Sequence, residues 1–214
     1  MNVGLFTPGL KEIKKTKYPS FVYLGRLKHY KNVDCAIGAF ANIVKKYETA
    51  QFIIAGKGEE EEYLRVLVKK QGLETSVKLL GFVDERQKYK LLASSWASIQ
   101  PSSFEGWGIT VIEANIVGTP VIASKINGLI DSVVDGKTGL LVPIRDEKVL
   151  SKAMEGIITD RKFRKDLSKK AYEWAKLFSW DKTAREFMRV ILRRLEPSAE
   201  VVFTQSTHVD YPIG

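Results

Sequence analysis

The sequence predicts an α/β protein built on a doubly wound, parallel, six-stranded sheet. Six short apolar runs rich in β-branched residues are spaced along the chain. Their apolar residues are continuous and not alternating, which is typical of strands covered on both faces. Helical patterns separate them, as in βαβ units. The predicted strands are Phe21–Leu24, Gln51–Ala55, Val77–Leu80, Ala97–Gln100, Pro120–Ala123 and Gly139–Val142.

The helices are predicted from their apolar period and from residues that start or stop helices. Asn32 and Asp84 are each predicted to cap the helix that follows, whereas Gly72 and Gly118 end helices. Three further helices follow the last strand. The predicted helices are Val33–Lys46, Glu59–Gln71, Glu85–Ala93, Thr110–Val117, Glu147–Ile158, Arg161–Leu177 and Trp180–Leu195.

The composition is that of an ordinary globular domain. The chain has 214 residues, of which 44% are hydrophobic, enough for a sizeable core. It contains no apolar run of about 18 residues, and Met1–Gly4 lacks the pattern of a secretion signal. The single cysteine, Cys35, excludes an internal disulfide and lies in a helical apolar pattern, so we expect a buried packing residue. A cytoplasmic location is expected, with peripheral contact at the inner membrane face in a longer parent protein.

The formal net charge of +9 raises the question of an acidic partner. Nucleic acid, an anionic membrane surface and a phosphate-bearing ligand are the candidates. The excess lies in residues 11–17, 161–170 and 185–194, and each run alone is typical of a solvated helix face or a basic linker. No zinc-finger spacing, RNP strand or helix-turn-helix is present, so nucleic acid is not expected. At most weak contact with a membrane surface is expected.

The most informative segment is Pro101–Glu113, which follows the fourth predicted strand. Ligands of an open parallel sheet bind beyond the carboxyl ends of its strands. Gly106 and Gly108 allow a close approach to a ligand just before a helix. The N–H groups of Gly108, Ile109 and Thr110 would point at an anion there.

Charged side chains at this edge are candidate ligand groups, each with a simpler alternative. Glu113 lies among apolar residues and could accept hydrogen bonds from sugar hydroxyls, but it could equally pair with a cation or face water. Arg26 and Lys31 follow the first strand and could neutralise phosphates, or be ordinary surface cations. Neither a G-x-G-x-x-G nor a G-x-x-x-x-G-K-[ST] motif is present. The chain also has no D-x-D triplet, so neither metal nor cofactor is predicted.

An ordered set of segments carries a family resemblance over about residues 20–195. Together it resembles the C-terminal, Rossmann-like domain of GT-B fold glycosyltransferases of group 1 (family GT4). The glycine-rich and acidic segments come in that family's order and spacing. The segments are Gly25-Arg26-Leu27 with Lys31-Asn32, Gly81-Phe82-Val83, Pro101–Gly108 through Glu113, Gly118–Val121, Asp135–Val142 and Phe178-Ser179-Trp180.

The resemblance implies retaining transfer of a sugar from a nucleotide-diphosphate donor, without a metal. Arg26 and Lys31 would hold the diphosphate, Glu105 would contact the donor sugar, and Glu113 would bind the ribose. The implied catalytic residues are thus Glu105, Arg26 and Lys31. The implied donor-binding residues are Gly25, Val83, Gly106, Gly108, Ile109, Thr110 and Glu113.

The chain also departs from the family pattern. Asn127–Asp131 replaces the frequent Gly-Gly-x-Pro-Glu, so the donor-side loop over 124–131 is the least certain part of the match. Trp107 stands where Phe is more frequent, and Asn115-Ile116 replaces small or Met residues.

The domain organisation follows from the same comparison. Residues 1–19 resemble an interdomain linker, 20–196 form the donor-binding domain, and 197–214 are a tail, expected to be disordered or a short extended arm. The N-terminal acceptor domain of the family would be absent, or supplied by a partner chain. The sequence would then be an excised piece, a natural fragment or one subunit of a split enzyme. The alternative function is a non-catalytic nucleotide-sugar-binding module; two glutamates could also serve a glycoside hydrolase, which the phosphate-type features disfavour.

Overall fold

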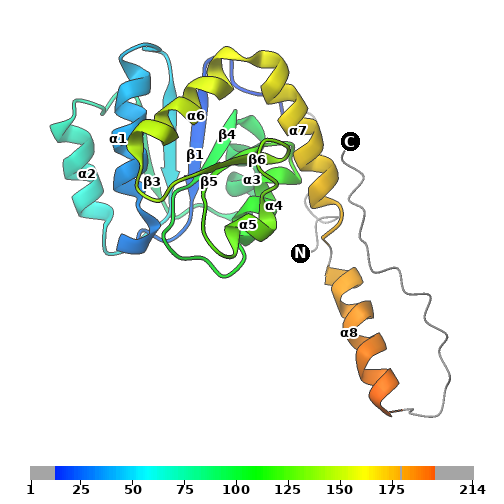
Figure 1. The fold of residues 1–214 in the computed structure, drawn as a ribbon. Helices are drawn as coiled ribbons and strands as arrows, with labels where there is room; N and C mark the ends of the chain where they lie inside the picture. The colour runs from blue at the N-terminus through cyan, green and yellow to red at the C-terminus, as the bar shows by residue number, and fades with distance from the viewer. Residues whose placement is uncertain (1–12, 179, 196–214) are drawn as a thin grey trace.

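The computed structural model describes residues 13–178 and 180–195, and shows one six-stranded parallel sheet with helices on both faces (Figure 1). The strand order is β3-β2-β1-β4-β5-β6. The predicted tail at 197–214 and the first part of the linker-like segment lie outside the described residues. The strands are β1 (Ser20–Leu24), β2 (Gln51–Ala55), β3 (Val77–Gly81), β4 (Ala97–Gln100), β5 (Val121–Ser124) and β6 (Gly139–Val142).

The predicted fold class is confirmed, and each strand lies within one residue of its predicted bounds. Every neighbouring pair of strands is parallel. Side chains of β1 alternate between two cores, with Phe21 and Tyr23 on one face of the sheet and Val22 and Leu24 on the other. Both faces are buried, which explains why the strands are continuously apolar in sequence.

The helices divide between the two faces. Side chains of α1, α2 and α6 pack in one core, and those of α3, α4 and α5 in the other. Helix α8 extends away from the sheet (Figure 1). The helices are α1 (Val33–Val44), α2 (Glu61–Lys70), α3 (Glu85–Ser94), α4 (Ile109–Asn115), α5 (Leu129–Ser132), α6 (Glu147–Thr159), α7 (Arg161–Ala175) and α8 (Trp180–Leu195).

One of the two predicted helix caps is confirmed. Asp84 accepts a hydrogen bond from the Gln87 backbone N–H and forms a reciprocal capping box. Asn32 occupies the cap position of α1 but makes no capping bond, so that prediction was wrong for its side chain. Its backbone is left-handed, with φ 49° and ψ 39°, a conformation that Asn tolerates better than most residues. The amide is instead bonded to the loop after β4.

Two short helices were not predicted. They are the 3₁₀ turn η3 (His29–Lys31) and α5, which have three and four residues. Neither is long enough to show an apolar period in sequence. Both lie after carboxyl ends of strands, where they shape the candidate site.

Buried polar and thiol groups complete the core. Cys35 is buried as predicted, and burial raises the pKa of its thiol to about 11, which leaves little reactive thiolate at neutral pH. Asn115, at one of the departures from the family pattern, is fully buried, and among the described residues its side-chain amide has no hydrogen-bond partner. Such a group costs about 1–3 kcal/mol of stability.

Candidate functional site

The strand order places a topological switch point between β1 and β4. The chain passes from β1 to β2 on one side of the sheet centre and from β4 to β5 on the other. In open sheets the loops after two such strands diverge, and the crevice expected between them at their carboxyl ends is the usual ligand site. The Gln100 amide at the end of β4 donates to the Leu24 carbonyl at the end of β1, over 3.5 Å. Every predicted catalytic residue lies in one of these two loops.

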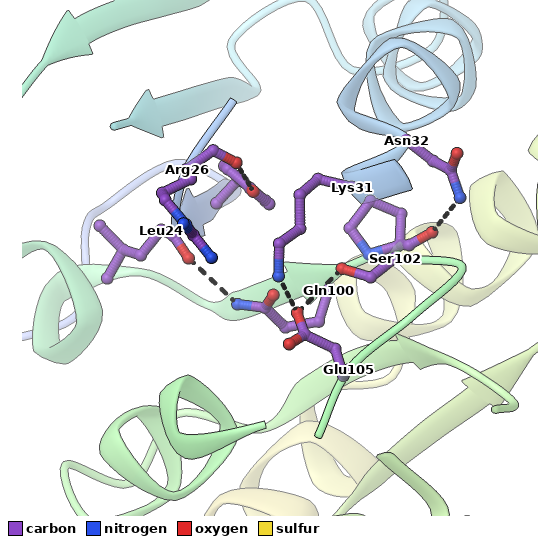
Figure 2. Close-up of polar contacts among 9 residues, drawn as sticks. Leu24, Arg26, Lys31, Asn32, Gln100, Ser102 and Glu105 are labelled. Atoms are coloured by element: carbon purple, nitrogen blue, oxygen red, sulfur yellow. Dashed lines mark hydrogen bonds and ion pairs between the residues drawn. The ribbon is translucent and has the colours of Figure 1, made fainter. Parts of the chain in front are cut away.

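Lys31 and Glu105 meet at this switch point, 74 positions apart in sequence. The Lys31 ammonium donates to the Glu105 carboxylate, and Ser102 Oγ donates to the same oxygen over 3.0 Å (Figure 2). The two charged side chains are only 12% and 16% exposed, which strengthens their attraction relative to a surface pair. Two of the residues predicted to be catalytic thus form one half-buried ion pair.

The Asn32 side chain braces the two loops against each other. Its amide nitrogen donates to the Pro101 carbonyl over 2.9 Å and to Ser103 Oγ over 2.6 Å. Its amide oxygen accepts from Arg145, which also pairs with Asp34. Asn32 directly follows Lys31, and so the brace fixes the spacing between the lysine and the loop that carries Glu105. Sequence patterns gave no sign of Arg145, because its link to Asn32 spans 113 positions.

Arg26 belongs to the same charged neighbourhood. The buried Tyr23 hydroxyl donates to the Arg26 carbonyl over 2.8 Å, which holds the turn after β1. Burial raises the pKa of Tyr23, the Glu105 carboxylate raises it further, and the Arg26 guanidinium opposes the shift. Both charges therefore act on one phenol. The Arg26 side chain is exposed, so its donors are accessible to a ligand. Gly25 directly follows β1, and its N–H donates to the Ala55 carbonyl.

Glu113 is buried on α4, and its partner in the structure is Lys88 of α3, at 2.7 Å. This is the cation pairing that the sequence left open; Lys88 itself was not predicted. Burial raises the pKa of Glu113, and the ion pair only partly offsets this effect. Burial also disfavours the charge of Lys88, but its hydrogen bonds to Glu113 and Glu85 outweigh burial and raise its pKa. Burial thus outweighs the ion pair for Glu113 but not for Lys88, because Lys88 has two carboxylate partners.

Glycines shape the loop that enters α4. Gly108 occupies the cap position with φ 73°, and a Cβ there would lie 2.6 Å from a Leu129 methyl carbon. Gly128, with φ 88°, packs so closely that a Cβ would lie 2.5 Å from the carbonyl oxygens of both Glu105 and Gly106. Gly128 belongs to the loop over 124–131, the least certain part of the family match. This loop therefore supports the backbone at Glu105. Only glycine fits either position without strain.

The predicted donor-binding amides lie at the start of α4. Ile109 and Thr110 are its first residues, so their N–H groups have no carbonyl one turn earlier in the helix. Trp107 anchors the preceding loop, with its ring 4.9 Å from that of Phe178. The structure thus brings Gly106, Gly108, Ile109 and Thr110 to the same sheet edge as the ion pair.

Large apolar side chains rim this edge and point to solvent. Phe82, Phe104 and Ile109 are 74%, 71% and 54% exposed, and each follows the carboxyl end of β3 or β4. Val83, one of the implied donor-binding residues, lies beside Phe82 and is half-buried. An apolar rim around a charged crevice is typical of a surface that another body covers.

Within the described residues, no three His, Cys, Asp or Glu side chains are grouped so that they could hold a metal ion. Over that same part of the chain, no helix is long and apolar enough to cross a membrane.

The fold and this arrangement define a doubly wound α/β domain with a charged site at its switch point, and the sequence comparison names its family. The family described as glycosyl transferases group 1 matches residues 10–174. The chain therefore belongs to the group 1 glycosyltransferase family.

Individual relatives and solved structures agree with this assignment. An uncharacterized glycosyltransferase of Methanocaldococcus jannaschii is 30% identical over 173 residues, covering 79% of this chain and 43% of the relative. The glycogen synthase of Mycobacterium tuberculosis is 29% identical over 174 residues, covering 73% of this chain and 42% of the relative. Sucrose-phosphate synthase from Thermosynechococcus elongatus has a similar structure, with a TM-score of 0.77 and 28% identity over 89% of this chain and 51% of that one. The chain thus spans less than half the length of these two curated relatives.

A further solved structure has a lower sequence identity and supports the assignment of the fold only. Anabaena HepE, in complex with UDP-glucose, matches with a TM-score of 0.75 and 23% identity. The match covers 82% of this chain and 49% of that one.

Proposed function

We propose that this domain binds a nucleotide-diphosphate sugar in the crevice between β1 and β4 and provides the donor half of a retaining, metal-independent glycosyltransferase. The observation that carries the proposal is the meeting of Lys31 with Glu105 at the topological switch point, beside the exposed Arg26. The structure of HepE with UDP-glucose supports the ligand class, since that protein shares the fold.

The charges of the crevice suit a diphosphate. Arg26 offers a planar, two-pronged donor and Lys31 a compact ammonium, and the amides at the start of α4 add oriented dipoles. These groups would stabilise the negative charge that develops on the diphosphate as the bond to the sugar breaks. With protein donors in these places, we propose that no metal ion is needed for the leaving group.

Donor binding would change the partners of Lys31. A phosphate oxygen would share the Lys31 ammonium with the Glu105 carboxylate, because an ammonium has three donors and one of them already bonds Glu105. Glu105, released or shared, could then accept hydrogen bonds from the hydroxyls of the sugar. Ser102, which donates to Glu105, would hold the carboxylate in place during this exchange.

The acceptor would be positioned by a second domain. The exposed rim of Phe82, Phe104 and Ile109 supports this part of the proposal, as does the longer chain of the relatives. Closure of such a domain over the crevice would exclude water and place the acceptor hydroxyl near the sugar.

Calorimetry with UDP-, GDP- and ADP-sugars tests the proposed ligand class. In a buffer with EDTA, we expect at least one of them to bind, with an affinity that falls as salt increases because the contact is between charges. Weak binding of every nucleotide, or binding that needs added Mg²⁺ or Mn²⁺, would contradict the proposal.

Glu113→Gln tests the proposed ribose contact. Gln keeps the shape of the side chain but loses the charge, so we expect nucleotide-sugar affinity to fall by about 1–3 kcal/mol. The melting temperature should change little, because Gln can still accept a hydrogen bond from Lys88. Glu85→Gln is the matched control, since Glu85 also pairs with Lys88 but is largely exposed. Equal losses in both variants would mean that Glu113 only fixes Lys88.

A further inference from the structure

A second cationic pocket lies at the opposite edge of the sheet. Its volume is about 70 Å³, which is room for several waters, since one water needs about 10–15 Å³ by this measure. Trp96 and Pro120, which line it, immediately precede β4 and β5. The pocket is therefore at the amino ends of these strands. The length of a four-residue strand, about 13 Å at ~3.3 Å per residue, separates it from the donor crevice.

Three cations line this pocket: Lys15, Arg164 and Lys165. Lys15 is exposed as a residue, but its ammonium donates to the Ser95 carbonyl and to the hydroxyl of the fully buried Thr119. The Arg164 guanidinium lies over the Trp96 ring, 3.7 Å from its centroid, and donates to carbonyls at the end of α6. All of these partners are neutral.

Within residues 13–178 and 180–195, no carboxylate pairs with these three cations. Of the ion pairs among the described residues, none includes Lys15, Arg164 or Lys165. The pKa of Lys15 is lowered to about 7, first by burial of its ammonium and then by the charge of Arg164. Burial likewise lowers the pKa of Arg164, with Arg161 adding to the effect. Positive charges without a described acidic partner, next to the apolar walls of Trp96 and Pro120, would attract an anion.

We propose that this pocket binds a phosphate-type anion, as inorganic phosphate or as the phosphoryl group of a phosphomonoester. The anion would accept hydrogen bonds from Lys15 and from the free edge of Arg164, with Lys165 closing the pocket from α7. It would supply a negative charge that the described residues do not provide there. The site is independent of the proposed nucleotide-sugar site at the other edge of the sheet.

Anion binding in this pocket would also stabilise the position of the segment before β1, residues 13–19. Thr16 already joins this segment to the body, because its N–H donates to the Ser94 carbonyl and its carbonyl accepts from the Trp96 indole. Lys15 is the adjacent residue. A bound anion would link Lys15 to α7, so we expect residues 13–19 to exchange amide hydrogens more slowly in its presence.

The Trp96 indole N–H resonance, assigned with Trp96→Phe, gives a local readout of binding in the full chain. Titration with inorganic phosphate, at constant ionic strength set by chloride, should move this resonance to saturation. Glucose 6-phosphate provides the second arm: tighter binding would identify a phosphomonoester as the ligand, and equal binding the free anion.

Variants separate this pocket from the donor crevice. Lys15→Gln should weaken binding at least tenfold, and Lys165→Gln, an exposed change that leaves the fold in place, should weaken it about threefold. Lys31→Gln in the donor crevice, and Lys70→Gln at an exposed position of α2, should leave the phosphate titration of the Trp96 resonance unchanged. A response that does not saturate, that chloride alone reproduces, or that survives both Lys15→Gln and Lys165→Gln would overturn the proposal.

The pH dependence supplies an independent check with sulfate, whose charge is constant between pH 6 and pH 8. With its pKa lowered to about 7, Lys15 loses its charge between pH 6 and pH 8. Ser95 and Thr119 are neutral, and no histidine or carboxylate lines the pocket in the described part of the chain. Sulfate should therefore bind several-fold more tightly at pH 6, and this preference should vanish in Lys15→Gln. Equal affinity at both pH values would contradict the role of Lys15.

Discussion

The purified 214-residue chain should fold, bind a nucleotide sugar and transfer no sugar to any acceptor. The six-stranded sheet is covered on both faces, so it has a core of its own. The donor crevice, in contrast, is rimmed by exposed side chains such as Phe82 and Phe104, and none of the described elements covers them. Without a second wall nothing orients the acceptor, a loss worth about 7–11 kcal/mol in favourable cases.

Mixing the chain with the N-terminal half of a family member, or fusing the two, provides the positive arm of this experiment. Recovered sugar transfer would identify the chain as an enzyme half. Donor binding that never leads to transfer with any partner would favour the alternative of a non-catalytic binding module. Robust transfer by the chain alone, at the rate of the fused protein, would contradict the proposal that a second domain positions the acceptor.

Lys31→Ala should weaken binding of a nucleoside diphosphate by about 10- to 100-fold, or about 1.5–3 kcal/mol, the range for hydrogen bonds to charged groups. Two effects act together: a phosphate loses its ammonium partner, and Glu105 keeps its charge at the crevice and repels the ligand. Binding of the nucleoside without phosphates should change little. Calorimetry with both ligands measures the difference.

Lys28→Ala is the matched control for Lys31→Ala. Lys28 lies three positions earlier and carries the same charge, but its side chain is 37% exposed, against 12% for Lys31, and it pairs with the exposed Glu59. Its loss should cost less than twofold in affinity, because exposed ion pairs contribute little. A melting curve for each variant checks the fold. Equal weakening in the two variants would mean that Lys31 acts only through net charge.

The sheet could be predicted from sequence because its signal is local. Each strand is a short run of apolar residues, and helix starts such as Asp84 carry their own capping pattern. The carboxyl edge was also predictable, since parallel strands all end there. Elements of three or four residues, such as η3 and α5, were missed because they show no period.

The pairings within the site could not be predicted, because they depend on strand order and on distant contacts. The meeting of Lys31 with Glu105 requires β4 to lie beside β1, which no local pattern specifies. The partner of Glu113 lies on another helix, 25 positions away. Asn32 was expected to cap α1 from its residue type alone, whereas the loop after β4 offers it a carbonyl and a hydroxyl.

The most direct test of the central claim is to map a nucleoside diphosphate on the folded chain by amide chemical shifts, in the presence of EDTA. The proposed function predicts that UDP or GDP moves resonances around Gly25–Lys31, Gly81–Val83 and Gly106–Glu113, at the carboxyl edge of the sheet. The amide resonances of residues near Trp96, at the amino edge, should not shift when phosphate already fills that pocket. Saturable shifts confined to that amino edge, or none at the carboxyl edge without a metal ion, would contradict the claim.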